Sequence, residues 1–250
     1  MSFTTMAEMA CLGAAFGAFG GLFGVGGGIV AIPMLVLIFH MEQHVAQGTA
    51  LVMMFPNTVR GFFKYRQRNC IDLRMAAILA GSAVLSTFMA ARIANALSTT
   101  TLRLAFCAFL ALLAVFFAAN SCNRSSSANL SPPLGWSSSW LVGVFGGALS
   151  GMFGIGGATL APPVLTSFYG LNQTTAQGLS MAMIAPGILV SLTVYGWADA
   201  VNWQIGLSMA AGGIVGVPVG VTIAHTIAER TLRLLFSGFI ILTVFAITLF

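Results

Sequence analysis

Long stretches without a charge or a histidine are the feature that most restricts how this chain can fold. Such sequence runs through residues 9–39, 104–123, 125–198 and 200–224. One helical crossing of a bilayer needs roughly 20 apolar residues, and each of these runs is at least that long. Only 6% of the 250 residues are charged, whereas soluble domains carry about 25% charged residues. The chain is therefore predicted to be an all-α polytopic membrane protein.

The sequence repeats itself at an offset of 130 residues. The stretch GLFGVGGGIVAIPML at 21–35 matches GMFGIGGATLAPPVL at 151–165 at eight of fifteen positions. The same offset aligns the AQG at 46–48 with the AQG at 176–178. A match at one fixed offset over this distance indicates a duplicated structural unit.

We therefore expect a first transmembrane repeat at 1–119 and a second at 138–250, joined by a hydrophilic Ser- and Pro-rich connection at 120–137. Each repeat divides into one glycine-interrupted segment and three spans, which makes eight hydrophobic segments. The interrupted segments, at about 9–39 and 138–169, are too long for one straight crossing and too short for two. A broken or re-entrant helical element is expected in each repeat.

The charge distribution favours inverted repeats. Half of the ten basic residues gather on one connection, which is therefore predicted to be cytoplasmic: Arg60, Lys64, Arg66, Arg68 and Arg74. If the interrupted element returns to its own side, each repeat crosses three times, the second repeat is inverted, and Arg233 joins this cluster. Arg103 falls on the opposite side and contradicts that arrangement. No nucleic-acid-binding module surrounds the cluster, so no nucleic-acid partner is expected.

The glycines of the first interrupted segment are of two kinds. Gly13, Gly17 and Gly21 recur every four residues, which is the spacing that lets membrane helices pack closely. The glycines that follow are too crowded to share one helix face, and they predict a break: Gly24, Gly26, Gly27 and Gly28. Non-helical backbone is tolerated at membrane depth only inside protein or beside a wet cavity.

A break of this kind has a chemical consequence. The first turn of the half-helix beyond it has amide groups without intrahelical partners and a partial positive charge, so it attracts small oxyanions. Pro33 and Pro163 lie in the half-helix beyond each break. Broken helices in corresponding positions of two repeats are typical of the central site of a transporter. A kink without a ligand is the alternative interpretation.

Polar side chains near the start of the following span can supply neutral hydrogen bonds to the same ligand. They are Gln47 and Thr49 in the first repeat and Gln177 and Ser180 in the second, with Asn57 farther along the first of these spans. Hydrogen bonding between neighbouring helices is an equally good explanation for them.

Catalytic chemistry has little support in the sequence. The spans contain no HExxH, no CxxC and no pair of aspartates, and the four cysteines lack metal-ligand spacing. We therefore expect no enzyme activity, no catalytic residue, no metal site and no cofactor. A loop with His40, Glu42 and His44 can shuttle protons near neutral pH, or simply be solvated, so proton coupling stays open.

Taken together, the doubled motif is similar to that of a known family. The pattern G-x-F-G-x-G-G-G-x-x-x-x-P followed by A-Q-G-T, and repeated as G-x-F-G-I-G-G-A-x-x-x-P-P with A-Q-G-L-S, resembles the sulfite exporter TauE/SafE family, also called the toluene sulfonate uptake permease family. The resemblance covers essentially the whole chain. It implies a multi-pass secondary transporter of the bacterial cytoplasmic membrane that carries sulfur-containing anions such as sulfite, sulfoacetate or sulfonates.

The resemblance also points to site residues. Carried over by position, the motif implies substrate binding by Gly24, Gly26, Gly27, Gly28 and Gln47, and by their repeats Gly154, Gly156, Gly157 and Gln177. Ala158 stands where Gly28 stands in the first repeat, and Pro162 is added, so the two halves of the site are not equivalent. An anion channel with the same backbone cradle is the alternative function. The exact substrate, the direction of transport, the coupling ion and homo-oligomerisation are left open.

Overall fold

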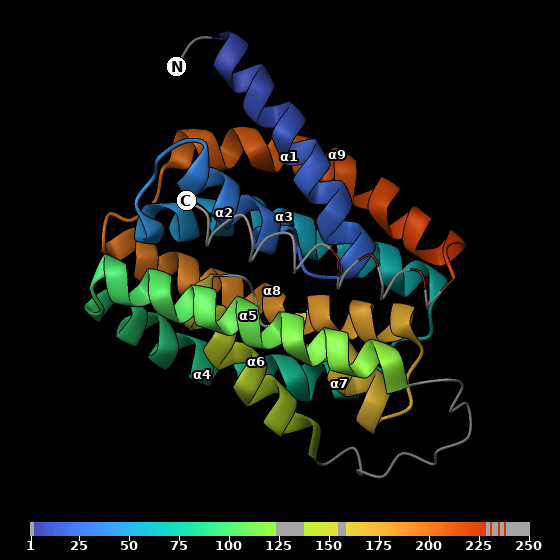
Figure 1. The fold of residues 1–250 in the computed structure, drawn as a ribbon. Coiled ribbons are helices and arrows are strands. Elements are labelled where there is room, and N and C mark those ends of the chain that lie inside the picture. Colours follow the sequence, from blue (N-terminus) through green and yellow to red (C-terminus); the bar gives the residue numbers. More distant parts are fainter. Residues whose placement is uncertain are drawn as a thin grey trace.

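The computed structural model describes residues 3–123, 138–154 and 159–228, together with positions 231, 235 and 238. The regular elements of these residues are helices (Figure 1): α1 (Phe3–Phe23), α2 (Gly28–Leu37), α3 (Gln43–Arg68), α4 (Leu73–Ala96), α5 (Thr99–Asn123), α6 (Ser139–Phe153), α7 (Ala161–Phe168), α8 (Gln173–Trp197) and α9 (Trp203–Thr226). The predicted all-α membrane architecture is confirmed. Most of the predicted connection at 120–137 and the predicted last span at 231–250 lie outside the described residues.

Several of these helices have the length and composition of membrane spans. Within the described residues, α4, α8, α9 and the Thr5–Phe23 part of α1 are long and apolar enough to cross a bilayer. Large apolar side chains stand out from the helix surfaces, and Leu85, Leu112, Phe145 and Val215 are each 68–72% exposed. Water would penalise such a surface, whereas lipid tails are as apolar as the side chains themselves.

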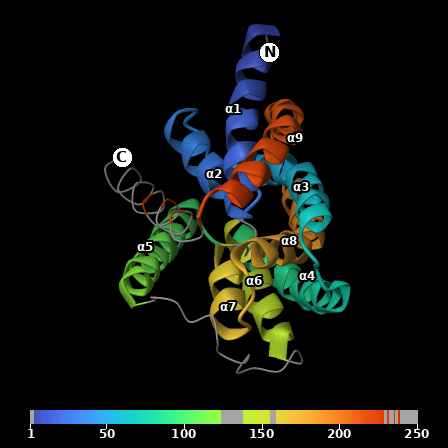
Figure 2. The ribbon, with the colours of Figure 1, turned by 90° about the vertical axis from the view of Figure 1, so that its right-hand side faces the viewer.

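The first helix of each repeat packs against the other repeat. Helix α1 lies along α9, and at the matching positions of the duplication α6 lies along α4. Figures 1 and 2 both show α1, α2, α3 and α9 in one half of the molecule and α4, α6, α7 and α8 in the other. Helices α3 and α8 contact each other where the halves meet. The duplicated sequence therefore builds two half-bundles that each combine helices from both repeats.

Regularly spaced glycines make the exchanged helix pairs close. A Cβ atom built on Gly17 would lie 2.7 Å from the Cα of Gly213 in α9. In the other half-bundle a Cβ on Gly147 would lie 2.7 Å from the Cα of Ala83 in α4. Real Cβ atoms do not approach backbone this closely, so the small residues at this spacing have the helix-packing role that their sequence spacing predicts.

Candidate functional site

The first predicted break is present between α1 and α2. Helix α1 ends at Phe23 and α2 begins at Gly28. Gly24 closes α1 in the left-handed region, with φ 74°, and the Val25 amide donates to the Gly20 carbonyl over 3.1 Å. This geometry is the Schellman ending of a helix, in which the left-handed residue is usually glycine because a Cβ would be strained. Gly26 and Gly27 have φ of 73° and 93° and turn the chain into α2.

The second repeat breaks at the matching place. Helix α6 ends at Phe153, and Gly154 follows with φ 66° and an amide that donates to the Ser150 carbonyl over 3.0 Å. Helix α7 begins at Ala161 and holds Pro162 and Pro163 in its first turn. The predicted site residues Gly156 and Gly157, and Ala158, lie outside the described residues.

The start of α2 presents amide groups without helical partners. The amides of Val30 and Ala31 both donate to the Gly27 carbonyl, over 3.2 and 3.1 Å. No hydrogen bond among the described residues reaches the amides at 26–29, and these four residues are buried. Buried amide groups need an acceptor, and those at a helix N-terminus favour a negatively charged one. The break therefore forms a donor-rich point inside the protein.

Each break lies against the glutamine of the opposite repeat. A Cβ on Gly24 would lie 2.6 Å from the Cβ of Gln177, and a Cβ on Gly154 would lie 3.2 Å from the Cβ of Gln47. Gly28 completes the group, since its Cβ would lie 3.4 Å from the Gly154 carbonyl oxygen. The structure thus brings together, from both repeats, five of the residues predicted to bind substrate.

Two tyrosines hold these glutamines in place. The Tyr65 hydroxyl lies 2.8 Å from Gln177 Oε1 and 2.7 Å from the Gly21 carbonyl, and the Tyr195 hydroxyl donates to Gln47 Oε1 over 2.7 Å. Tyr65 is 130 residues before Tyr195, as Gln47 is before Gln177, so the two contacts are reciprocal. Reciprocal contacts are those of a pair of units related by a twofold axis. We call these contacts the tyrosine–glutamine pairs.

The amide groups of the two glutamines differ in their partners. Gln177 Nε2 donates to the Leu22 carbonyl over 3.2 Å, which ties the end of α1 to α8. Gln47 Nε2 is buried and has no hydrogen-bond partner among the described residues. A buried donor without a partner is costly, and it can serve a ligand that brings an acceptor.

The remaining predicted residues have other contacts. Thr49 accepts from the Asn202 amide over 2.9 Å and so fixes the turn before α9. Ser180 donates to the Ala176 carbonyl in its own helix over 2.7 Å. Asn57 is fully buried with both polar atoms unpartnered, and it faces α9, where a Cβ on Gly213 would lie 2.5 Å from its Nδ2. None of these three side chains hydrogen-bonds to the described part of either broken segment.

A histidine that sequence reasoning passed over lies beside one tyrosine–glutamine pair. The His225 ring lies 5.4 Å from the Tyr65 ring, and its Nε2 is 3.0 Å from Asn69 Nδ2. Thr174 donates to Asn69 Oδ1 over 3.1 Å and connects this group to α8. The one sequence signal for the tyrosines was their match at the repeat offset. His225 had no such signal, because Asn95 stands at its counterpart.

The contact between Tyr65 and Gln177 is expected to stabilise the fold. Tyr65→Phe and Gln177→Leu should each lower the free energy of unfolding by about 1–2 kcal/mol, because each leaves a buried polar partner unsatisfied. In a double-mutant cycle the two changes should be coupled by about 1 kcal/mol. Thermal unfolding in detergent measures this. Tyr169→Phe is the matched control, because the contact of its hydroxyl with Ser138 Oγ is longer, at 3.5 Å. Strictly additive losses in Tyr65→Phe and Gln177→Leu would contradict the contact between these two side chains.

Comparison with known proteins also points to a membrane transporter. A model of the family described as Sulfite exporter TauE/SafE matches residues 9–247. A probable membrane transporter protein of Xylella fastidiosa strain Temecula1 is 27% identical over 82% of this chain and 79% of its own length. Probable membrane transporter protein MJ0441 of Methanocaldococcus jannaschii is 29% identical, over 89% of this chain and 87% of its own.

A further relative is the Bacillus subtilis probable membrane transporter protein YdhB, which is 24% identical over 85% of this chain and 88% of its own length. No solved structure is significantly similar to the chain. The family match extends over both broken helices and both tyrosine–glutamine pairs. This chain is therefore a multi-pass membrane protein that belongs to the TauE/SafE sulfite exporter family of membrane transporters.

Proposed function

We propose that this chain is a secondary transporter that carries a small sulfur-containing anion, of the sulfite, sulfoacetate or sulfonate class, across the cytoplasmic membrane. The anion binds where the two broken segments meet. The observation that carries the proposal is the buried start of α2, where the amides at 26–29 have no hydrogen-bond partner among the described residues. The family to which the chain belongs is described as a sulfite exporter family, which supports the substrate class.

Backbone amides suit a ligand that must be released again. A lysine or arginine would add a full charge and bind a dianion tightly, whereas a helix N-terminus offers only a partial positive charge. The unpartnered Nε2 of Gln47 supplies another neutral donor beside Gly154. Gly156 and Gly157 are proposed to complete the cradle from the second repeat, by their position in the repeated motif.

The division into half-bundles supports a mechanism of alternating access. The two half-bundles meet through α3 and α8, which carry Gln47 and Gln177. A rocking movement of one half-bundle against the other would expose the broken segments to each side in turn, as in transporters built from repeats. The proposal involves no chemical conversion of the anion. The inverted orientation of the repeats remains a prediction, and proton coupling and homo-oligomerisation stay open.

Flux measurements test the proposal directly. Proteoliposomes with purified protein should accumulate labelled sulfite or a labelled sulfonate, and unlabelled anion trapped inside should accelerate uptake of label by counterflow. A channel with the same cradle would give ohmic current without counterflow. An imposed pH gradient tests proton coupling in the same vesicles. If sulfite, sulfoacetate and sulfonates all move no faster than in protein-free vesicles, the proposed substrate class is wrong.

A further inference from the structure

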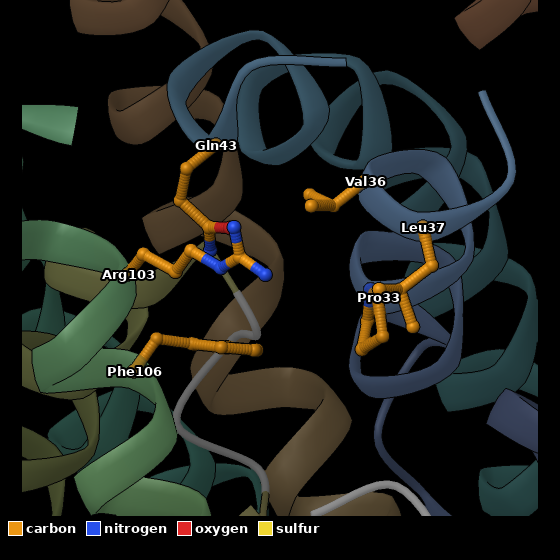
Figure 3. Close-up of a pocket in the computed structure, with 6 residues that line it drawn as sticks. All are labelled: Pro33, Val36, Leu37, Gln43, Arg103 and Phe106. Atoms are coloured by element: carbon orange, nitrogen blue, oxygen red, sulfur yellow. The ribbon is translucent and has the colours of Figure 1, made fainter. Parts of the chain in front are cut away.

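A pocket lies between α2, α3 and α5, beside the part of α2 that follows the break (Figure 3). Its walls come from three helices and include one cation and one amide: Pro33, Val36, Leu37, Gln43, Arg103 and Phe106. The enclosed space is about 10 Å³, which is close to what one water-sized group needs. The pocket can therefore take one oxygen atom of a larger molecule, whose remainder stays at its mouth.

Two polar side chains of this pocket carry donor groups that have no described partner. Gln43 is only 4% exposed, and its Nε2 has no hydrogen-bond partner among the described residues. Arg103 is half-buried, and no ion pair or hydrogen bond of the described residues involves its guanidinium group. In Figure 3 the Arg103 and Gln43 side chains extend into the same space between α5 and α3. Two donor groups that face one space and have no described partner favour an acceptor-rich, negatively charged ligand.

The duplication preserves this donor pair. At the offset of 130, Gln43 corresponds to Gln173 and Arg103 to Arg233, and Pro33 and Phe106 correspond to Pro163 and Phe236. Arg233 and Phe236 lie outside the described residues, so this comparison concerns the sequence alone.

Arg92, in α4, behaves differently. Arg92 corresponds to Thr222, is exposed, and lies over the rings of Phe88 and Trp197 at 5.3 and 5.8 Å. Aromatic contacts of this kind are enough to hold an arginine at a membrane surface. Arg103 has no such aromatic partner among the described residues, and an arginine recurs at this position of the sequence in both repeats.

We propose that the pocket of Gln43 and Arg103 is a second anion site, which binds one oxygen of an oxyanion such as a sulfonate or phosphate group. Val36, Leu37 and Phe106 form apolar walls around the bound oxygen. Pro33 lies five residues along α2 from Gly28, or about 7.5 Å at the rise of an α-helix. If the proposed transport function holds, the site is an intermediate binding site on the anion's path to or from the broken segments. Binding itself does not depend on that function.

Arginine labelling tests the binding without any transport. Phenylglyoxal modifies accessible arginines, and mass spectrometry reads the rate at Arg103 and, as the matched control, at Arg92. Purified protein in nanodiscs is labelled at constant ionic strength with potassium chloride, potassium sulfate or potassium butanesulfonate, and in discs with or without phosphatidylglycerol. An oxyanion at ten times its Kd should slow labelling of Arg103 about tenfold and leave Arg92 unchanged.

The arms of this experiment distinguish the sources of the oxyanion. Protection by butanesulfonate or sulfate identifies a soluble anion, and protection only in discs with phosphatidylglycerol identifies a lipid headgroup. Gln43→Leu should weaken the protection, and its folding is checked by thermal unfolding. Equal rates at Arg103 in every arm, or equal slowing at Arg103 and Arg92, would overturn the proposal. The unmodified protein suffices for that result.

Transport kinetics test whether the pocket of Gln43 and Arg103 is an intermediate binding site on the transport path. Arg103→Gln should raise KM for the carried anion several-fold with an unchanged maximal rate, whereas Arg92→Gln removes the same charge and should change neither. An unchanged KM in Arg103→Gln would remove the site from the transport path. If the parental protein carries none of the proposed anions, the proposed function fails while the labelling result still decides whether this site exists.

Discussion

Gly28→Leu is expected to abolish anion transport, while Gly28→Ala leaves a folded and partly active protein. Gly28 is the first residue of α2 and has an ordinary helical φ, so a side chain there meets space restrictions but no backbone strain. An added Cβ would clash with Met54 Sδ, and it would lie 2.9 Å from Met54 Cε and 3.4 Å from the Gly154 carbonyl oxygen. Alanine requires the Met54 side chain to change its rotamer, and Ala158 already stands at the matching position of the second repeat.

A leucine would extend into the space over the free amides and exclude the anion from them. Losing two charge-assisted hydrogen bonds of about 1.5–3 kcal/mol each corresponds to at least a hundredfold loss of binding. Initial rates of sulfite and methanesulfonate uptake in proteoliposomes measure the effect. Size-exclusion profile and thermal midpoint serve as folding controls, and Gly28→Leu/Met54→Ala makes room for the new side chain. A well-folded leucine variant with the parental rate would be incompatible with the proposed site.

Gly216→Ala is expected to destabilise the protein, and Gly81→Ala to stabilise it. Both glycines lie inside helices, so the intrinsic gain from replacing glycine by alanine is the same, about 0.5–1 kcal/mol. The environments differ. A Cβ on Gly216 would meet the backbone of α1 at Ala14 and Ala18, with the Ala18 amide nitrogen at 2.9 Å, whereas a Cβ on Gly81 has nothing within 4 Å.

Backbone cannot move aside as a side chain can, so the alanine at 216 pushes α1 away from α9. Overpacking of this kind costs about 1–3 kcal/mol, or more where two helices must separate. At about 2–4 °C per kcal/mol, Gly216→Ala should unfold several degrees below the parent and Gly81→Ala slightly above it. Tryptophan fluorescence during heating in detergent gives both midpoints. Equal midpoints for the two variants would show that α1 and α9 do not pack as described.

The breaks could be predicted from local sequence, and the duplication from the match at one fixed offset. Crowded glycines cannot share one helix face, and positive φ at Gly24, Gly26, Gly27 and Gly154 is the backbone expression of that restriction. The four-residue spacing of Gly13 and Gly17 likewise predicted close helix packing, although it did not identify α9 as the partner helix. The prediction of an all-helical membrane protein needed only hydropathy and span length.

The partners could not be predicted from the same information. Nothing local indicates that α1 packs on α9, or that Tyr65 reaches Gln177, because these contacts join residues more than a hundred positions apart. Gln47 and Gln177 were expected near the breaks, but each turned out to lie against the break of the other repeat. Thr49 and Ser180 looked equivalent to them in sequence, yet they hydrogen-bond to the turn before α9 and to their own helix. Side-chain direction, which the fold decides, separates the two groups.

Locating a bound anion by crystallography tests whether the substrate binds at the amides of the broken helices. Selenite is the heavy counterpart of sulfite, and anomalous diffraction from crystals grown with it would mark the selenium position. We expect one strong peak at the junction of the broken segments, with selenite oxygens within about 3.2 Å of the amide nitrogens of Gly28 and Ile29. A selenium site away from both breaks, with these amides bonded to protein carbonyls instead, would contradict the proposed anion site.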